Sequence, residues 1–115
     1  MNLAIVGARQ LGLDVCRAII EAAIDRYDAT AVVSGGAAGV DTWAELIAGE
    51  RGLLTIVYLP QIHSWAGYQA RNLQIARKCD ALVRIAWAHS HTYGSGWTRD
   101  RARELGKPTE EFLLP

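Results

Sequence analysis

Residues 34–41, Ser-Gly-Gly-Ala-Ala-Gly-Val-Asp, form the densest cluster of residues that could bind an anion. They follow a short apolar run and lead directly into a predicted helix. Glycine permits backbone conformations and close approaches that are closed to larger residues. Backbone N–H groups at a helix N-terminus, together with the helix dipole, attract a phosphate. The turn therefore favours phosphate binding, with glycines used purely for packing as the alternative.

A second glycine-rich turn and one arginine-bearing turn support the same chemistry. Residues 94–98, Gly-Ser-Gly-Trp-Thr, again lead into a predicted helix, and Arg9 closes the turn that begins at Gly7 after the first predicted strand. Two anion sites at one edge of a sheet suggest a ligand with a phosphate and a second polar end. Neither glycine-rich turn contains the Gly-Lys-Ser/Thr of a Walker A motif, so kinase or ATPase chemistry is not indicated.

The candidate ligand-binding residues come from these turns and from the third predicted helix. They are Gly7, Arg9, Ser34, Gly35, Gly36, Ala37, Gly39, Asp41, Arg71, Asn72, Gly94, Ser95, Gly96 and Thr98. The guanidinium groups of Arg9 and Arg71 suit planar anions, with an ordinary surface arginine as the alternative for each. Asp41 either holds ribose hydroxyl groups or begins a helix with a favourable charge. Asn72 is either a ligand contact or a packing hydrogen bond.

Aromatic and histidine side chains surround the 94–98 turn. Trp87 and Trp97 could stack on a base, with packing in the core or at a subunit interface as the alternative. His89 and His91 form an i,i+2 pair without a neighbouring carboxylate or cysteine cluster, which is a weak metal signature. We therefore expect solvated histidines and no metal site.

Alternating strands and helices must position the turns. Short apolar runs predict strands at residues 3–6, 30–33, 53–59, 81–87 and 109–114. Periodicity and terminal signals predict helices at 11–27, from a Thr42–Glu45 capping box to Gly49, at 68–79, and from 98 to Gly106. Right-handed crossovers then require a mostly parallel five-stranded sheet with helices on both faces. The predicted class is α/β, doubly wound, with the ligand outside the C-terminal ends of the strands.

The composition of the chain limits the kinds of protein it can be and the partners it can have. A chain of 115 residues with 50% hydrophobic and 21% charged residues predicts one globular domain. No long apolar run or signal-peptide pattern opens it, so we expect a cytoplasmic protein without a membrane partner. Lys plus Arg and Asp plus Glu both number 12, which leaves no basic excess for binding duplex phosphates. Cys16 and Cys79 do not make a disulfide framework, and we expect both to be reduced and buried.

In the order of its motifs the chain resembles the SLOG superfamily. The resemblance rests on the turns at 7–9, 34–41 and 94–98, on Arg71-Asn72, and on residues 106–108, Gly-Lys-Pro. That superfamily groups the DNA-processing protein DprA, the LOG phosphoribohydrolases, molybdenum-cofactor carriers and small stand-alone domains, and the chain looks most like the stand-alone group related to YpsA. The resemblance implies a Rossmann-like fold and a nucleotide or nucleotide-derived ligand, NAD-derived signals included, at the same turns.

A departure from the LOG pattern bears on catalysis. LOG enzymes carry Pro-Gly-Gly-x-Gly-Thr-x-x-Glu, whose Glu acts with an Arg of the preceding helix to cleave an N-glycosidic bond. Here Arg71 matches that Arg, but Arg101 stands at the place of the Glu, and Asp100 is one residue away. A slip of one residue turns a helical side chain by roughly 100°. We therefore expect a binding protein that senses, carries or sequesters its ligand without turning it over.

Two alternatives stay open. The first is a nucleoside monophosphate phosphoribohydrolase that uses Arg71 with Asp100 or Asp41. The second is DprA-like binding of single-stranded nucleic acid, which the net charge of zero and the absence of any appended domain disfavour. We expect a small-molecule nucleotide as the partner, and a homo-oligomer because the chain holds four tryptophans and because small domains of the superfamily commonly associate.

Overall fold

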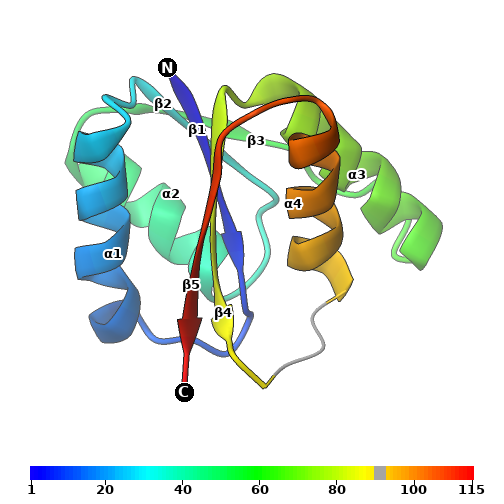
Figure 1. Cartoon of the computed structure of the whole chain (residues 1–115), viewed down its shortest axis with the longest axis horizontal. Coiled ribbons are helices and arrows are strands. Elements are labelled where there is room, and N and C mark those ends of the chain that lie inside the picture. Colours follow the sequence, from blue (N-terminus) through cyan, green and yellow to red (C-terminus); the bar gives the residue numbers. More distant parts are fainter. Residues whose placement is uncertain (90–92) are drawn as a thin grey trace.

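Five parallel strands and four helices make up the described part of the chain, residues 1–89 and 93–115 of this computed structural model (Figure 1). The strand order is β3-β2-β1-β4-β5. The elements are β1 (Asn2–Gly7), α1 (Leu13–Arg26), β2 (Ala31–Ser34), α2 (Val40–Glu50), β3 (Leu54–Val57), α3 (Trp65–Lys78), β4 (Ala81–Trp87), α4 (Tyr93–Glu104) and β5 (Thr109–Leu114). The predicted α/β, doubly wound class with a Rossmann-like fold is confirmed.

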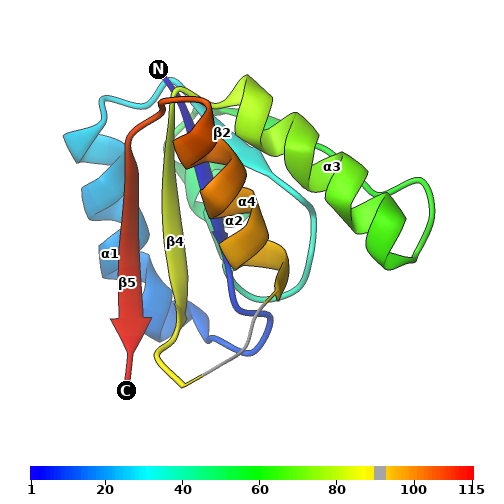
Figure 2. The same cartoon turned by 45° about the vertical axis from the view of Figure 1, so that its right-hand side comes forward.

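Alternate residues of the central strands supply two apolar clusters, one on each face of the sheet. Leu3 and Ile5 of β1 pack with α1 and α2, whereas Ala4 and Val6 pack with α3 and α4. Figure 2 shows α1 on one side of the sheet and α3 and α4 on the other. Both cysteines are free and buried in these clusters. Because β1 is covered on both faces, its end provides a fixed position for the turn at Arg9.

Helices α3 and α4 begin earlier than the sequence pattern predicts. Helix α4 starts at Tyr93, so residues 94–98 lie within this helix and not in a turn before it. Helix α3 starts at Trp65 and not at Tyr68, because the Ser64 hydroxyl caps it by accepting a hydrogen bond from the Gly67 N–H at 3.3 Å. The earlier start moves Trp65 from a connecting segment onto a helix. Among the described residues, no helix is long and apolar enough to cross a membrane.

The capping box predicted at Thr42 and Glu45 is wrong. Helix α2 begins at Val40 with a glycine as its N-cap. The Thr42 hydroxyl donates instead to the Ala37 carbonyl oxygen at 2.8 Å, and the Glu45 carboxylate accepts from the Ser34 hydroxyl at 2.7 Å. These hydrogen bonds close the 34–41 turn on itself.

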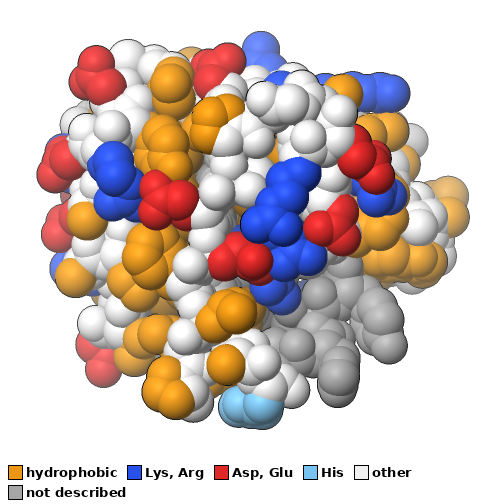
Figure 3. Space-filling model, in the orientation of Figure 1, with side chains coloured by type: hydrophobic (Ala, Val, Ile, Leu, Met, Phe, Trp, Pro, Cys, Tyr) orange, Lys and Arg blue, Asp and Glu red, His pale blue; other side chains and the backbone are white. Residues whose placement is uncertain are grey.

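The two edge strands differ in charge. On β5, Glu111 accepts a hydrogen bond from Arg84 of β4 at 2.7 Å and also pairs with Arg99 of α4. Figure 3 shows basic and acidic side chains lying together over this part of the surface. On β3, by contrast, Leu54 is 65% exposed and Val57 is 40% exposed. The strand predicted at 53–59 is therefore present in a shorter form, as an exposed apolar edge of the sheet.

Gly36 packs against the exposed edge that β3 forms. Its φ is +70°, and a Cβ atom there would lie 2.6 Å from Leu59 Cδ2 and 3.2 Å from Val57 Cγ1. The sequence pattern predicts that Gly36 makes room for a ligand phosphate. The structure places Gly36 differently, because a side chain at this position would contact β3 and the segment that follows it.

We expect Gly36→Ala to lower the free energy of unfolding by about 1–2 kcal/mol, since an alanine at positive φ is strained. Gly49→Ala is the matched control: a Cβ at Gly49, inside α2, has no atom within 4 Å. That control should be neutral or gain up to about 1 kcal/mol from helix propensity. Chemical denaturation of both variants measures the effect. Equal stability of the two variants would contradict the assigned role of Gly36.

Candidate functional site

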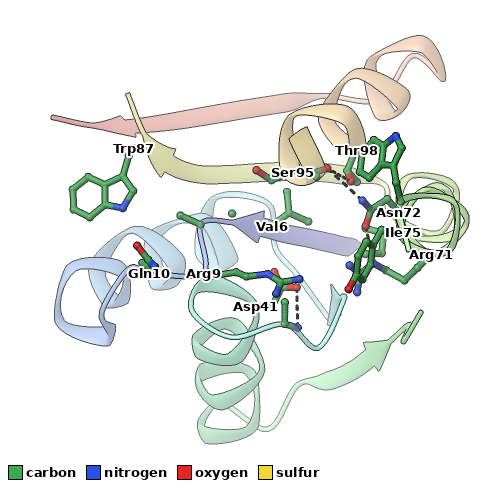
Figure 4. A pocket seen from close by; sticks show the side chains of 16 residues that line it. Val6, Arg9, Gln10, Asp41, Arg71, Asn72, Ile75, Trp87, Ser95 and Thr98 are labelled. Carbon is green, nitrogen blue, oxygen red and sulfur yellow. Dashed lines mark hydrogen bonds between the residues drawn. The ribbon is translucent and has the colours of Figure 1, made fainter. Parts of the chain in front are cut away.

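A cleft of about 410 Å³ lies at the C-terminal ends of β1 and β4 (Figure 4). These strands are neighbours in the sheet, yet the chain leaves β1 toward α1 on one face and leaves β4 toward α4 on the other. A crevice between such diverging connections is where ligands bind in open α/β sheets. The volume is in the usual range for small-molecule sites.

Most of the candidate residues meet in this cleft. Those that line it are Gly7, Arg9, Ala37, Asp41, Arg71, Asn72, Gly94, Ser95 and Thr98. Ser34, Gly35, Gly36, Gly39 and Gly96 do not line it. Asp100 is also outside the cleft, where it pairs with Arg99 at 2.9 Å. The structure therefore does not bring Asp100, the candidate carboxylate of the hydrolase alternative, to the cleft.

Arg71 connects the turns that surround the cleft. Its side chain is buried, donates from Nε to Asn72 Oδ1 at 2.7 Å, and donates from Nη1 to the Gly35 carbonyl oxygen. Asn72 in turn donates to the Gly94 carbonyl oxygen at 3.4 Å, and that oxygen also accepts from the Thr98 hydroxyl at 2.8 Å. The 34–41 turn, α3 and the start of α4 are thereby held in one arrangement.

Asp41 is a buried carboxyl group beside this arginine. Burial, with a smaller contribution from the nearby Glu45 carboxylate, raises its pKa from 3.8 to about 6. The Ala37 N–H, which donates to the carboxylate at 3.3 Å, and the Arg71 guanidinium oppose that rise. Burial likewise lowers the pKa of Arg71. The two groups form a buried pair on the wall of the cleft, and the Asp41 charge offsets that of Arg71.

Arg9 is exposed and extends into the cleft from the turn after β1 (Figure 4). Within the described residues it has no ion-pair partner. The backbone of this turn sits against the start of α2, where the Val40 N–H donates to the Ala8 carbonyl oxygen at 3.2 Å. Only glycine fits at position 39, because a Cβ would lie 2.4 Å from that oxygen. Gly39 therefore positions Arg9 without lining the cleft itself.

Aromatic side chains of α3 line the cleft and were not among the candidates. Trp65 and Tyr68 both belong to its wall, and Arg71 lies over the Tyr68 ring at 5.8 Å. The early start of α3 at Ser64 brings Trp65 there, so the serine cap was the signal that could have identified it. Trp87 lines the cleft as well, whereas Trp97 lies behind Trp65 in an edge contact of 6.1 Å.

Metal ligation has little support in the described residues. His89 packs against the Trp87 ring at 6.0 Å, and no group of three His, Cys, Asp or Glu residues comes together there. His91, the other histidine of the predicted pair, lies outside the described residues.

Comparisons with known proteins find a matching family model and a similar solved structure. The family model described as DNA recombination-mediator protein A matches residues 1–83. The X-ray structure of DNA processing protein A (DprA) from Streptococcus pneumoniae superposes with a TM-score of 0.76 and 22% sequence identity, covering 96% of this chain. The chain spans about half of that protein, since the match covers 49% of its length. No curated protein matches the chain. The predicted resemblance to the SLOG superfamily is confirmed.

Asp41→Asn should gain stability relative to the wild type as the pH rises from about 4 to about 7. The pKa of Asp41 is higher in the fold than in the unfolded chain, so folding favours the neutral acid. The resulting stabilisation is complete below the unfolded pKa and is lost as the pH rises through about 6. The asparagine variant lacks this titration, so the difference in unfolding free energy should shift by up to about 3 kcal/mol.

Chemical denaturation of both proteins across this pH range measures the shift. Other carboxyl groups titrate in both proteins and cancel in the difference. A difference that stays constant with pH would contradict a raised pKa for Asp41.

Proposed function

The chain belongs to the DNA recombination-mediator protein A family, and from this premise we propose that its cleft binds a phosphate-bearing nucleotide unit. The unit is either a free nucleotide or nucleotide derivative, or one residue of a single-stranded nucleic acid. Arg9 faces the phosphate, and the aromatic wall formed by Trp65 and Tyr68 faces the base. The protein binds this ligand without cleaving it.

The position of Arg9 is the observation that carries the proposal. It is a cation inside a cleft at the strand ends, and no carboxylate of the described residues pairs with it. A guanidinium presents several donors in a planar fork that matches phosphate oxygens. Arg71 serves differently, because Asp41 and the Gly35 carbonyl oxygen already engage it. We assign Arg71 to shaping the cleft and Arg9 to holding the anion.

The backbone of the 34–41 turn contributes less to phosphate binding than its sequence predicts. The Gly36 N–H points to the Ser34 hydroxyl at 3.3 Å, and the Ala37 N–H points to the Asp41 carboxylate. These donors are engaged within the turn. The proposal therefore places the ligand phosphate at the Arg9 side of the cleft.

Single-stranded nucleic acid is the second candidate, and the family match favours it. The solved relative is named for DNA processing, but this chain spans only half of it. The net charge of zero argues for few phosphate contacts. Salt dependence separates the two ligands, because each phosphate neutralised on a single strand adds about 0.7 to the slope of log K against log salt.

Arg9→Gln is expected to weaken binding of AMP and of a single-stranded oligonucleotide by roughly 10- to 100-fold, the loss of one charge-assisted hydrogen-bonding group. Arg77→Gln is the matched control: it removes the same charge from an exposed site on α3 outside the cleft. Calorimetric titrations at about 50 and 200 mM salt give affinity and salt slope together. Equal losses in both variants, or no loss with Arg9→Gln, would refute the assignment.

AMP and other nucleoside monophosphates should release no free base at an enzyme-like rate when incubated with the protein. Arg101 stands where a hydrolase of LOG type has its carboxylate, and it lies over the Trp97 ring at 4.8 Å, outside the cleft. Chromatography of the reaction mixture tests this. Release that disappears in both Arg71→Ala and Asp41→Asn would establish hydrolysis with Asp41 as the carboxylate. Release that is insensitive to both would indicate a contaminating enzyme.

A further inference from the structure

The longest stretch of the chain without a charged side chain lies at the surface. Residues 52–70 contain no Asp, Glu, Lys or Arg, although these four types make up 21% of the chain. Within this stretch Leu54 is 65% exposed, Leu59 and Ile62 are each 66% exposed, and Val57 is 40% exposed. Large contiguous apolar patches are rare on monomeric proteins and mark interaction sites. The composition of this stretch is therefore that of a covered surface.

Strand β3, inside this stretch, has an open hydrogen-bonding edge. It ends the sheet on its side and pairs with β2 alone among the described strands. The Leu54 N–H donates toward β2, to the Thr30 carbonyl oxygen, and backbone groups alternate in direction along a strand. Those of Thr55 and Val57 therefore point to the open side. The opposite edge strand, β5, carries two glutamates paired with arginines, a protection against pairing with other chains that β3 lacks.

A groove of about 440 Å³ lies beside this edge, between the segment that follows β3 and the outer face of α3. Leu59 and Ile62 line it from the segment, and Ala66 and Ala70 line it from the helix. Gly67 lets the segment lie close to α3, because a Cβ atom there would be 1.9 Å from the Ile62 carbonyl oxygen. Figure 2 shows the segment and the start of α3 extending beyond the sheet. The groove and the open edge form one apolar face.

We infer that β3 pairs edge to edge with β3 of a second copy of the chain, which joins two five-stranded sheets into one. A twofold axis across the strands makes the pair antiparallel, and identical edges can then exchange N–H···O=C hydrogen bonds. Antiparallel pairing brings the start of one strand beside the end of the other. Leu54 shares a face of the sheet with Ile56, which packs toward α3. It is thereby directed to the groove at Leu59 and Ile62 of the other copy.

The charge and the size of this face favour a second copy as its partner. An uncharged surface offers no attraction to an acidic or basic protein, whereas two uncharged copies meet without repulsion. A standard interface covers about 800 Å² on each partner, and the four exposed side chains supply roughly half of that area. The strand backbone and the walls of the groove supply the remainder. Because both open edges are satisfied in one contact and β5 is charged, the assembly ends at two copies.

Sedimentation velocity of the full chain from about 1 to 100 μM tests the inference in the wild-type protein. We expect twice the monomer mass at the upper concentrations. A chain that stays monomeric over the whole range would overturn the inference. The proposed function would be unaffected, since the cleft lies at the ends of β1 and β4.

Substitutions on the two edge strands locate the interface. Leu54→Lys should weaken self-association by about 100-fold or more, because a buried leucine contributes a factor of roughly ten and each dimer holds two. Thr55→Pro should also weaken it, since proline removes an outward N–H, adds no charge and spares the ladder to β2. Leu113→Lys is the matched control: Leu113 is 51% exposed on β5, and its substitution should leave the dimer unchanged.

Hydrogen exchange reads the strand pairing directly. The Val57 amide should exchange at least about tenfold faster in Leu54→Lys and Thr55→Pro than in the wild-type dimer, because only the dimer engages that amide. Circular dichroism identifies folded variants, and Ile62→Lys, outside the sheet, replaces a β3 variant that does not fold. A dimer that persists in the folded variants, or that Leu113→Lys disrupts instead, would place the contact on another face and overturn the inference.

Discussion

Burial of the Arg71 guanidinium is the interaction on which the cleft depends. Removing such a charge from water costs several kcal/mol unless its hydrogen bonds and a counter-charge are supplied. The Gly35 carbonyl oxygen, Asn72 and Asp41 supply them, and each comes from a segment that the arginine thereby fixes. The turn after β2 and helix α3 hold one geometry because they share this cation, and Asn72 extends the contact to the start of α4. Loss of Arg71 would leave the Asp41 carboxyl buried without its counter-charge.

In this arrangement Arg71 is engaged within the protein, whereas Arg9 is available to a ligand. The first turn of α2 has a positive dipole end that attracts anions, but Asp41 occupies it and its charge offsets both the dipole and Arg71. Arg9 is left as the exposed cation of the cleft. The local pattern of charge therefore supports anion binding in a chain whose net charge is zero. Net charge alone gives a poor guide to such a site, because a ligand experiences the few groups that line the cleft.

Local signals predicted the sheet well and the site in part. Strand β4 matches its apolar run because a buried strand needs little more than a continuous apolar segment, and the half-buried edge strand β5 also has its predicted bounds. The place of the cleft follows from strand order and the diverging connections. The sequence did not predict which segments these residues contact: Gly36 packs against β3, and Lys107 donates to carbonyl oxygens at the end of α3. Both contacts join segments that are distant in the chain, which periodicity cannot relate.

The topology itself favours a ligand with two ends. Where neighbouring strands send their connections to opposite faces, the cleft between them opens onto both layers, and each layer can present one side chain to the same ligand. In this chain the strand between the two layers ends in an arginine turn.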